Sequence, residues 1–335
     1  PDADVHTFDD GHGRVPPFCV RFCEHQPHIA AVADEEGMVS LFDTSMAPLT
    51  RAGGSPNGAC WRAHNNALFD IAWVPTTDQL ISASGDQTCR VWDVQLQRQT
   101  LVCKGHTGSV KTVSCTRSEP SVFCSGGRDG CLISWDMRVG PSPVAIVHGV
   151  HGSSGGGGRK RSREGGPHRS VTSVLCLSDN TLATGGATDG AVKLWDGRII
   201  RRSAKTRATP VPLSVLTPSP SHGITCLAVD PAARRLLVNS KDNSVYLYDT
   251  VRPEAGQIGR LRGHLVDTFY IKACFSPDGR FVLAGSSDRQ MYLWETDRPD
   301  EPLVLEGHLA EVTGVDWCAA DFTKVISCSD DGTLR

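Results

Sequence analysis

The sequence lacks long apolar runs and has almost no net charge. No run of 18 apolar residues occurs among its 335 residues, so we expect no membrane-spanning helix. No leader of basic residues followed by an apolar stretch is visible, so we expect no secretion signal. The 34 lysine and arginine residues nearly balance 37 aspartate and glutamate residues, which gives a formal net charge of -3. That balance excludes a protein that binds nucleic acid through overall charge alone.

Paired cysteine motifs are absent as well. The 13 cysteines are spread from Cys19 to Cys328 without a C-x-x-C pair, and several lie inside apolar, strand-like runs. The chain also has no N-x-S/T glycosylation site. We therefore expect reduced, buried thiols in an intracellular protein, with no disulfide framework, no zinc site and no cofactor.

Turn-forming residues are abundant, and they separate the copies of an internal repeat. The chain has 34 glycines and 20 prolines, which suits tight turns better than long helices. Five copies place an Asp six residues before an aromatic residue, and these pairs are Asp86 and Trp92, Asp129 and Trp135, Asp189 and Trp195, Asp242 and Tyr248, and Asp288 and Trp294. A weaker first copy has Glu36 before Phe42, and a last copy has Asp331 near the end of the sequence. The chain therefore contains seven copies.

Each copy contains short β-branched or apolar runs of four to six residues between turn signals, which is typical of antiparallel strands. We expect no helix of useful length between them. One such meander is too small to be stable alone and must stack on its neighbours. The repeats resemble the WD-repeat family, whose fold is a β-propeller with four strands per blade. The resemblance predicts an all-β, seven-bladed WD-repeat propeller.

The copies define the expected domain boundaries. Residues 1–15 are an N-terminal lead-in and residues 16–335 the propeller, with copies at about 18–43, 63–93, 105–136, 168–196, 222–249, 263–295 and 307–335. The last copy stops at Arg335, two residues short of the position of its aromatic residue. We therefore expect a truncated last blade with an unpaired edge, and a ring that closes poorly.

The family resemblance implies a structural network that joins a loop His, a strand Ser or Thr, a turn Asp and a strand Trp. Two such networks are expected, formed by His64, Ser82, Asp86 and Trp92 in one blade and by His106, Ser125, Asp129 and Trp135 in the next. The carboxylate fixes the imidazole, and the hydroxyl links the imidazole to the indole N–H. Ala284, Phe42 and Tyr248 depart from this pattern, so their blades should be held less firmly.

The same residue types form the catalytic triad of many hydrolases. An enzyme needs one such site, whereas a repeating fold needs a structural network in every blade, so the repetition favours the structural role. No H-E-x-x-H or paired-cysteine metal motif occurs in the sequence. We therefore expect a protein that is not an enzyme and has no catalytic or metal-binding residues.

Two copies end in a longer motif, which reads W-D-M-R at 135–138 and W-D-G-R at 195–198. Both motifs end the third strand of consecutive copies, so both arginines should lie on one face of the disc. A single such arginine is usually a solvated turn residue. The pair resembles the W-D-x-R signature of propellers that dock on the damaged-DNA-binding-protein adaptor of cullin-4 RING ubiquitin ligases, and guanidinium groups suit such contacts. The implied adaptor-binding residues are Asp136, Arg138, Asp196 and Arg198.

An insertion separates the third and fourth copies. Residues 150–170 combine a run of glycine and serine with the basic stretch R-K-R-S-R at 159–163. This composition cannot form a core, so we expect a flexible basic loop. An import signal, a weak DNA contact and a merely solvated charge run are all compatible with it.

Longer stretches resemble one member of this receptor group across nearly the whole chain, and they are residues 63–75, 85–88, 123–130, 268–272 and 321–331. The resemblance implies a non-catalytic substrate-recognition subunit whose partners are the adaptor, cullin-4 and its RING subunit. It also implies binding of degron-bearing substrates on the DNA sliding clamp (PCNA), among them a replication licensing factor, a cyclin-dependent-kinase inhibitor and a histone methyltransferase. The expected location is the nucleus, on chromatin during replication or repair, with no membrane contact and at most weak or indirect contact with DNA.

The degrons of this group carry a basic residue, which acidic groups of the propeller would receive. The candidates near predicted loop ends are Asp34, Glu35, Glu36 and Asp70, although most acidic loop residues only improve solubility. A generic WD-repeat scaffold and a reader of modified histone tails are alternative functions, because a fold alone does not determine function. The paired W-D-x-R motif favours the ligase receptor over both.

Overall fold

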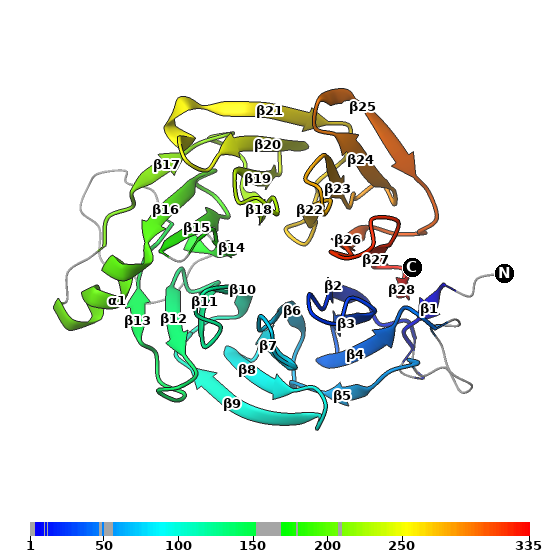
Figure 1. Cartoon of the computed structure of the whole chain (residues 1–335), viewed down its shortest axis with the longest axis horizontal. Helices are drawn as coiled ribbons and strands as arrows, with labels where there is room; N and C mark the ends of the chain where they lie inside the picture. The colour runs from blue at the N-terminus through cyan, green and yellow to red at the C-terminus, as the bar shows by residue number, and fades with distance from the viewer. Residues whose placement is uncertain are drawn as a thin grey trace.

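The computed structural model describes residues 4–9, 11, 13–46, 49, 56–151, 169–178, 180–206 and 210–335. These residues form seven four-stranded antiparallel sheets arranged as a ring around a central channel (Figure 1). The expected seven-bladed propeller is confirmed.

Each blade has its first strand next to the channel and its fourth strand on the rim. The first four blades are β2 (Pro17–Phe22), β3 (Ile29–Asp34), β4 (Met38–Asp43) and β5 (Cys60–Arg62); β6 (Leu68–Trp73), β7 (Gln79–Ser84), β8 (Thr88–Asp93) and β9 (Arg98–Lys104); β10 (Val110–Cys115), β11 (Val122–Gly127), β12 (Leu132–Asp136) and β13 (Ala145–Val147); and β14 (Val171–Cys176), β15 (Thr181–Gly186), β16 (Val192–Asp196) and β17 (Ser214–Leu216). The other three are β18 (Ile224–Val229), β19 (Arg235–Ser240), β20 (Ser244–Asp249) and β21 (Gln257–Arg262); β22 (Ala273–Phe275), β23 (Phe281–Ala284), β24 (Met291–Glu295) and β25 (Arg298–Leu305); and β26 (Val312–Trp317), β27 (Val325–Ser329), β28 (Thr333–Leu334) and β1 (His6–Thr7).

The core of the protein lies between blades, because the sheets stack face to face around the ring. One cluster joins side chains of blades 2 and 3, among them Ile81, Phe123 and Trp135. The second strands are covered on both faces, and in β11 all six residues are buried. Gly126 of this strand has no room for a side chain, because a Cβ there would lie 2.6 Å from Cγ1 of Val171 in the next blade.

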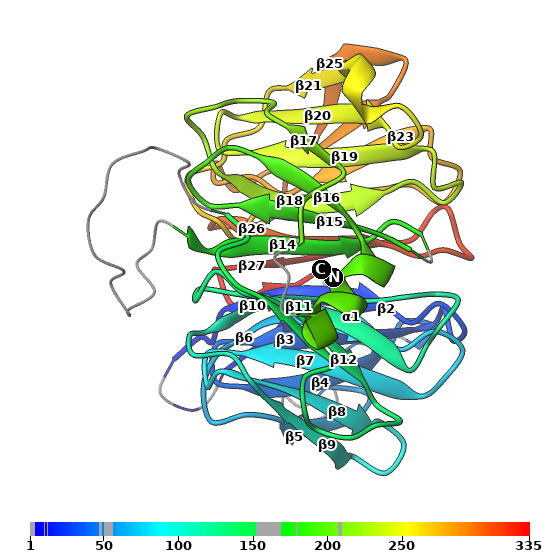
Figure 2. The ribbon, with the colours of Figure 1, turned by 90° about the vertical axis from the view of Figure 1, so that its left-hand side faces the viewer.

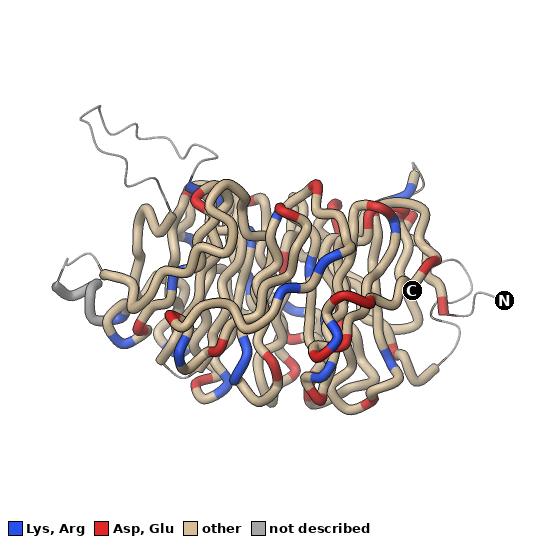
Figure 3. The backbone as a smooth tube through the Cα atoms, turned by 90° about the horizontal axis from the view of Figure 1, so that it is seen from above, with Lys and Arg blue, Asp and Glu red and all other residues tan. Residues whose placement is uncertain are grey.

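The repeated topology gives the disc two different faces. All seven innermost strands begin on one face, which we call the top face, and end on the other, the bottom face. The turns between second and third strands therefore lie on the top face, and the ends of the third strands lie on the bottom face. Figure 2 shows the stacked strands from the side, and Figure 3 shows acidic and basic residues interspersed over the disc.

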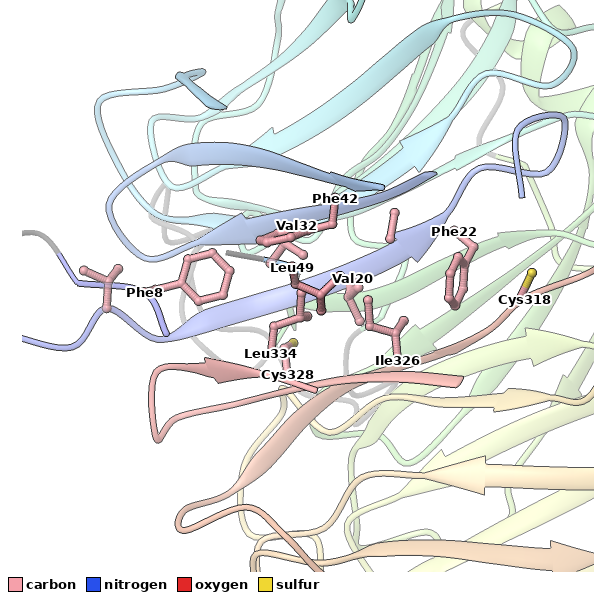
Figure 4. Close-up of a cluster of buried hydrophobic side chains, with 12 residues drawn as sticks. Phe8, Val20, Phe22, Val32, Phe42, Leu49, Cys318, Ile326, Cys328 and Leu334 are labelled. Atoms are coloured by element: carbon pink, nitrogen blue, oxygen red, sulfur yellow. The ribbon is translucent and has the colours of Figure 1, made fainter. Parts of the chain in front are cut away.

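The ring closes, so the expected unpaired edge in the last blade is wrong. β1 pairs antiparallel with β28, placing His6 opposite Leu334 and Thr7 opposite Thr333. The seventh blade thus takes its fourth strand, His6–Thr7, from the segment that was expected to be a separate lead-in. Figure 4 shows Phe8 and Leu334 in the cluster of buried side chains that fills this junction.

Helical structure is almost absent from the described residues. The exceptions include α1 (Gly197–Thr206) and the 3-10 turn η2 (Pro253–Ala255). No described helix is long and apolar enough to cross a membrane. Most of the predicted flexible loop, residues 152–168, lies outside the described residues.

Candidate functional site

Two turns on the bottom face hold an aspartate and an arginine in the same arrangement. In blade 3, Arg138 donates from Nε to Oδ1 of Asp136 at 2.9 Å and from Nη2 to Oδ2 at 2.7 Å. In blade 4, Arg198 binds Asp196 through the same atoms at 3.2 and 2.9 Å. The backbone N–H of each arginine also donates to the Oδ1 atom of its aspartate. Each carboxylate therefore fixes the plane of one guanidinium group.

The paired arginines face solvent, whereas their aspartates are largely covered. Each arginine side chain is 62% exposed, against 16% for Asp136 and 15% for Asp196. Hydrogen bonds from the arginines lower the pKa of both aspartates, which keeps them charged. A guanidinium group has five N–H donors, and two serve the aspartate in each turn, so donors remain for a second molecule. The structure thus brings all four predicted adaptor-binding residues to one face, in adjacent blades.

An exposed β-branched residue follows each arginine, a feature that we did not predict. Val139 is 72% exposed and Ile199 is 46% exposed. The signal was present in the sequence, because the W-D-x-R motif continues as R-V in one copy and R-I in the other. An apolar side chain next to an oriented cation is typical of a protein interface.

Helix α1 joins the two blades that carry these turns. It starts directly after Asp196 and contacts β13 of blade 3 and β16 of its own blade. Ile200, which is 1% exposed, packs into the cluster between these blades. The expectation that no helix of useful length separates the copies is wrong here, because burial of Ile200 on one side stabilises a short peripheral helix.

The two predicted structural networks are present in blades 2 and 3. In blade 2, His64 Nδ1 lies 2.9 Å from Asp86 Oδ2, and His64 Nε2 lies 2.8 Å from Ser82 Oγ. Trp92 donates from Nε1 to the same Ser82 Oγ at 3.1 Å. Burial of Asp86 alone would raise its pKa, but hydrogen bonds from His64 and a neighbouring threonine lower it to about 2. The serine is fully buried, so it cannot act as a nucleophile toward a substrate.

Blade 3 repeats this geometry with the same atoms. His106 Nε2 lies 2.8 Å from Ser125 Oγ, and its Nδ1 lies 3.0 Å from Asp129 Oδ2. Trp135 donates to Ser125 at 2.8 Å. Ser125 is also fully buried. These sets are structural links between the strands of a blade.

Two further networks were missed at the sequence level. In blade 4, His151 contacts Asp189 at 2.9 Å and Thr184 at 2.9 Å, and Trp195 donates to the threonine hydroxyl. Its histidine is separated from the other three residues by the glycine-rich insertion, which hid the pattern. In blade 7, His308 contacts an aspartate and a serine, and these partners are Asp331 and Ser327.

The blades that depart from the motif use other hydrogen bonds. Because blade 6 has Ala284 in place of a hydroxyl residue, Trp294 donates to the backbone oxygen of Arg262 at 2.9 Å. His264 instead reaches blade 5, where its Nε2 lies 2.9 Å from Asn239 Oδ1. Burial lowers the pKa of His264 to about 4, so it is neutral at physiological pH.

The four candidate substrate-binding residues do not form one group. Glu35 and Glu36 are exposed in the turn between β3 and β4 on the top face. Asp34 begins this turn but is 5% exposed, and its Oδ1 accepts a hydrogen bond from the backbone N–H of Met38. Burial raises the pKa of Asp34 to about 6. Only the two glutamates face a ligand that approaches from the top.

Asp70 lies inside β6, so its predicted place at a loop end is wrong. It is 4% exposed, and its Oδ1 accepts a hydrogen bond from Lys272 Nζ at 2.6 Å. Its Oδ2 accepts the backbone N–H of Val113 at 3.1 Å. Burial opposes ionisation, but Lys272 and Arg21 hold its pKa below the usual range. Asp70 is therefore a paired charge of the channel wall.

Asp70 and Lys272 both line the channel, a cavity of about 620 Å³ that is enclosed by residues of all seven innermost strands. Cys226 and Cys274 are among them, and all 13 cysteines of the chain have free thiols. Within the described ranges, no group of three or more His, Cys, Asp or Glu side chains is placed to hold a metal ion.

Sequence comparison agrees with this repeated geometry. The profile of the family described as WD domain, G-beta repeat matches residues 56–93, 97–136, 161–196, 211–249, 256–295 and 301–335. The chain belongs to the WD-repeat family. Strands β2, β3 and β4 of the first blade lie outside the matched segments, in agreement with the weaker motif of this WD-repeat protein there, and the structure shows that they form a complete sheet with β5.

Curated proteins similar to this WD-repeat chain include denticleless proteins of several animals. The denticleless protein homologs of Gallus gallus and Homo sapiens are 39% and 37% identical to it, over 96% and 99% of the chain. Protein lethal(2)denticleless of Drosophila melanogaster is 37% identical over 98% of the chain. The matches cover 47%, 48% and 45% of these relatives, so the chain spans about half their length. Denticleless is the receptor-group member that the longer motifs resemble, and that resemblance is confirmed.

Proposed function

We propose that this propeller is the non-catalytic substrate-recognition part of a cullin-4 RING ubiquitin ligase and docks on the damaged-DNA-binding-protein adaptor through its bottom face. The observation that carries the proposal is the duplicated turn, in which Asp136 and Asp196 orient two exposed arginines in adjacent blades. A scaffold without a dedicated partner has no need for two identical, solvent-facing guanidinium groups. The similarity to denticleless proteins supports the same function.

The two faces of the disc suit the two tasks of such a receptor. The oriented arginines are on the bottom face, and the turns after each second strand leave the top face for a degron presented on the DNA sliding clamp. The replication and cell-cycle proteins that carry these degrons would be ubiquitinated in the nucleus, on chromatin. The ligase subunits supply catalysis, and the propeller raises the local concentration of substrate lysines near the conjugating enzyme.

The apolar residues beside the arginines extend the proposed adaptor contact. Val139 and Ile199 stand in the same position relative to Arg138 and Arg198, and both are exposed. An adaptor that accepts the guanidinium hydrogen bonds would cover these side chains at the same time, which excludes water from the polar contact. We therefore expect the apolar pair to matter for affinity although it forms no hydrogen bond.

The test is the affinity of the chain for purified adaptor. The double variant Arg138→Ala with Arg198→Ala should bind roughly 30-fold more weakly or worse, since it leaves buried acceptors of the adaptor unpaired. The matched control is Arg252→Ala, because Arg252 is an exposed arginine in the corresponding turn of blade 5 whose backbone N–H also binds an aspartate. The control should bind normally.

A structural role for the arginines predicts a different result. If the arginines mainly stabilise the turns, the double variant has a lower melting temperature, and its loss of adaptor affinity results from misfolding. Val139→Ser with Ile199→Ser separates the two cases, because these side chains are exposed and take no part in the Asp–Arg hydrogen bonds of the turns. Weaker binding by this second variant at an unchanged melting temperature supports docking, and normal adaptor affinity of both double variants refutes it.

A further inference from the structure

Three parallel aromatic rings bridge the top of the channel. Phe18, Phe69 and Tyr270 come from blades 1, 2 and 6, and their ring planes agree within 7°. The ring centroids are 5.1 Å apart for Phe18 and Tyr270, 6.0 Å for Phe18 and Phe69, and 5.9 Å for Phe69 and Tyr270. All three side chains are partly exposed. We call this group the aromatic shelf, and it offers partly exposed ring surface on the top face.

A lysine from blade 3 lies on this shelf. Lys111 Nζ is 3.1 Å from the centroid of the Phe69 ring and 5.4 Å from that of Tyr270. Burial, with a contribution from the nearby positive charge of Arg128, lowers the pKa of Lys111 to about 8. No carboxylate among the described residues forms an ion pair with it. A partly desolvated ammonium group held only by aromatic rings favours an anionic partner from outside the chain.

Negative charge gathers on the other side of the shelf. Burial and the negative charges of Glu311 and Glu35 raise the pKa of Asp330 to about 6. Hydrogen bonds place both residues beside the shelf. Glu35 donates its backbone N–H to the oxygen of Pro16, two residues before Phe18. Asp330 donates its backbone N–H to the oxygen of Glu311, and the Glu311 carboxylate binds Thr268, which also accepts the N–H of Tyr270. Glu311 is held in place by the hydroxyl groups of two neighbouring residues, Thr268 and Ser287. These carboxylates come from the top turns of blades 7 and 1.

Positive charge continues beyond Lys111 in the opposite direction. Arg128 is exposed in the top turn of blade 3, and exposed Arg169 lies against Gly130 of the same turn. The shelf therefore separates a basic sector at blades 3 and 4 from an acidic sector at blades 7 and 1. A ligand that matches this surface has a negative group, an apolar group and a positive group in that order.

We infer that the top-face surface formed by the aromatic shelf, Lys111 and the flanking acidic turns binds an extended segment of a partner protein that carries an acidic group, an apolar side chain and a basic group in that spatial order. The apolar side chain lies against the shelf, the acidic group pairs with Lys111, and the basic group pairs with Glu35 and Asp330. One part of the inference rests on the proposed function, namely that this segment belongs to a ubiquitination substrate.

Charge complementarity favours a protein segment over a nucleic acid. Exposed aromatic rings next to basic residues also suit the stacking of single-stranded bases. A strand that crosses the shelf, however, would bring its phosphates against Glu35 and Asp330, and the chain as a whole has a net charge of -3. A peptide can present both signs of charge within a few residues, as this surface requires.

The experiment uses the chain without any adaptor. A display library of random twelve-residue peptides is selected on the protein, and the affinity of an enriched, fluorescently labelled peptide is measured by anisotropy. We expect enriched peptides to contain an acidic, an apolar and a basic residue. Lys111→Gln should weaken binding at least about tenfold, as at a central interface residue. The control Lys104→Gln changes an exposed lysine of the rim strand β9 and should bind normally.

A second measurement changes only the peptide and so cannot be affected by misfolding. Replacing the acidic residue of the peptide by its amide should weaken binding to the original protein but cause little further loss with Lys111→Gln. Equal losses with both proteins, or peptides enriched without regard to charge, would overturn the inference. A labelled oligodeoxythymidylate that binds through Lys111 more tightly than every peptide would also overturn it. Adaptor affinity does not enter these measurements, so the docking proposal and this inference fail independently.

Discussion

Replacing Phe8 by alanine tests whether the seam between the first and last blades holds the ring together. Phe8 is 6% exposed, and its ring meets the rings of His6 and Phe42 edge-on at centroid distances of 4.7 and 6.1 Å. Its backbone N–H donates to the oxygen of Gly332 at 2.8 Å. Phe8→Ala keeps this hydrogen bond and removes the ring, so it measures the packing contribution alone.

The expected loss is large compared with the size of the strand that Phe8 follows. Removal of a buried phenylalanine ring costs about 3–5 kcal/mol, because apolar contact is lost and a cavity remains. β1 contributes only two residues to its sheet, so few other contacts hold it to β28. A loss of about 3 kcal/mol changes the opening equilibrium of this junction on the order of 100-fold.

Hydrogen exchange followed by mass spectrometry locates the effect. Amides of β28 and β1 should exchange on the order of 100-fold faster in Phe8→Ala, whereas those of β15, in blade 4, should be unchanged. The control Phe322→Ala removes a 45% exposed ring of the same blade and should have little effect at the seam. Unchanged exchange of β28 in Phe8→Ala would show that β1 does not close the ring.

Two further substitutions test the structural networks and a buried histidine. Ser125→Ala removes the hydrogen-bond partner of two buried groups, His106 and Trp135. It should lower the free energy of unfolding, measured by chemical denaturation, by about 1–3 kcal/mol for each group. The control is Ser118→Ala, which changes an exposed serine. Burial lowers the pKa of His6 to about 4, below its value of about 6.5 in an unfolded chain. The unfolded state therefore binds more protons in this range, and stability should fall as the pH drops from about 6.5 to 4. His6→Asn should reduce that fall, and a parallel pH dependence of both proteins would contradict the assignment.

Much of the fold was predictable because the repeat encodes it many times. Strand patterns, turn glycines and the spacing of Asp129 and Trp135 recur in successive copies, so a weak local signal becomes strong when it is counted across the chain. The common position of Arg138 and Arg198 followed from the same logic, since equivalent residues of repeated blades must share a face. Repetition therefore predicts the architecture and the face on which equivalent residues of different blades lie.

Features that depend on single long-range contacts were not predictable. β1 has no strand pattern of its own, and its partner Leu334 lies at the other end of the chain. In the sequence, Asp70 has the properties of a solvated loop residue. Only the closed ring places it next to Lys272, which lies four blades further along the chain. Phe69 and Tyr270 are ordinary strand and loop aromatics in the sequence, and only closure of the ring stacks them. In each case the decisive neighbour is set by tertiary structure alone.

The Lys272–Asp70 ion pair has a mechanical consequence for the disc. Neighbouring blades can slide against each other at their interfaces. A ring of blades can therefore distort into an oval although each single blade is rigid. The 2.6 Å contact links blade 6 to blade 2 across the channel. It therefore limits how far these two distant blades can move apart. A force applied over the opening of the channel then acts on an opening of fixed width. The propeller transmits this force to its opposite face without a change in the shape of the ring.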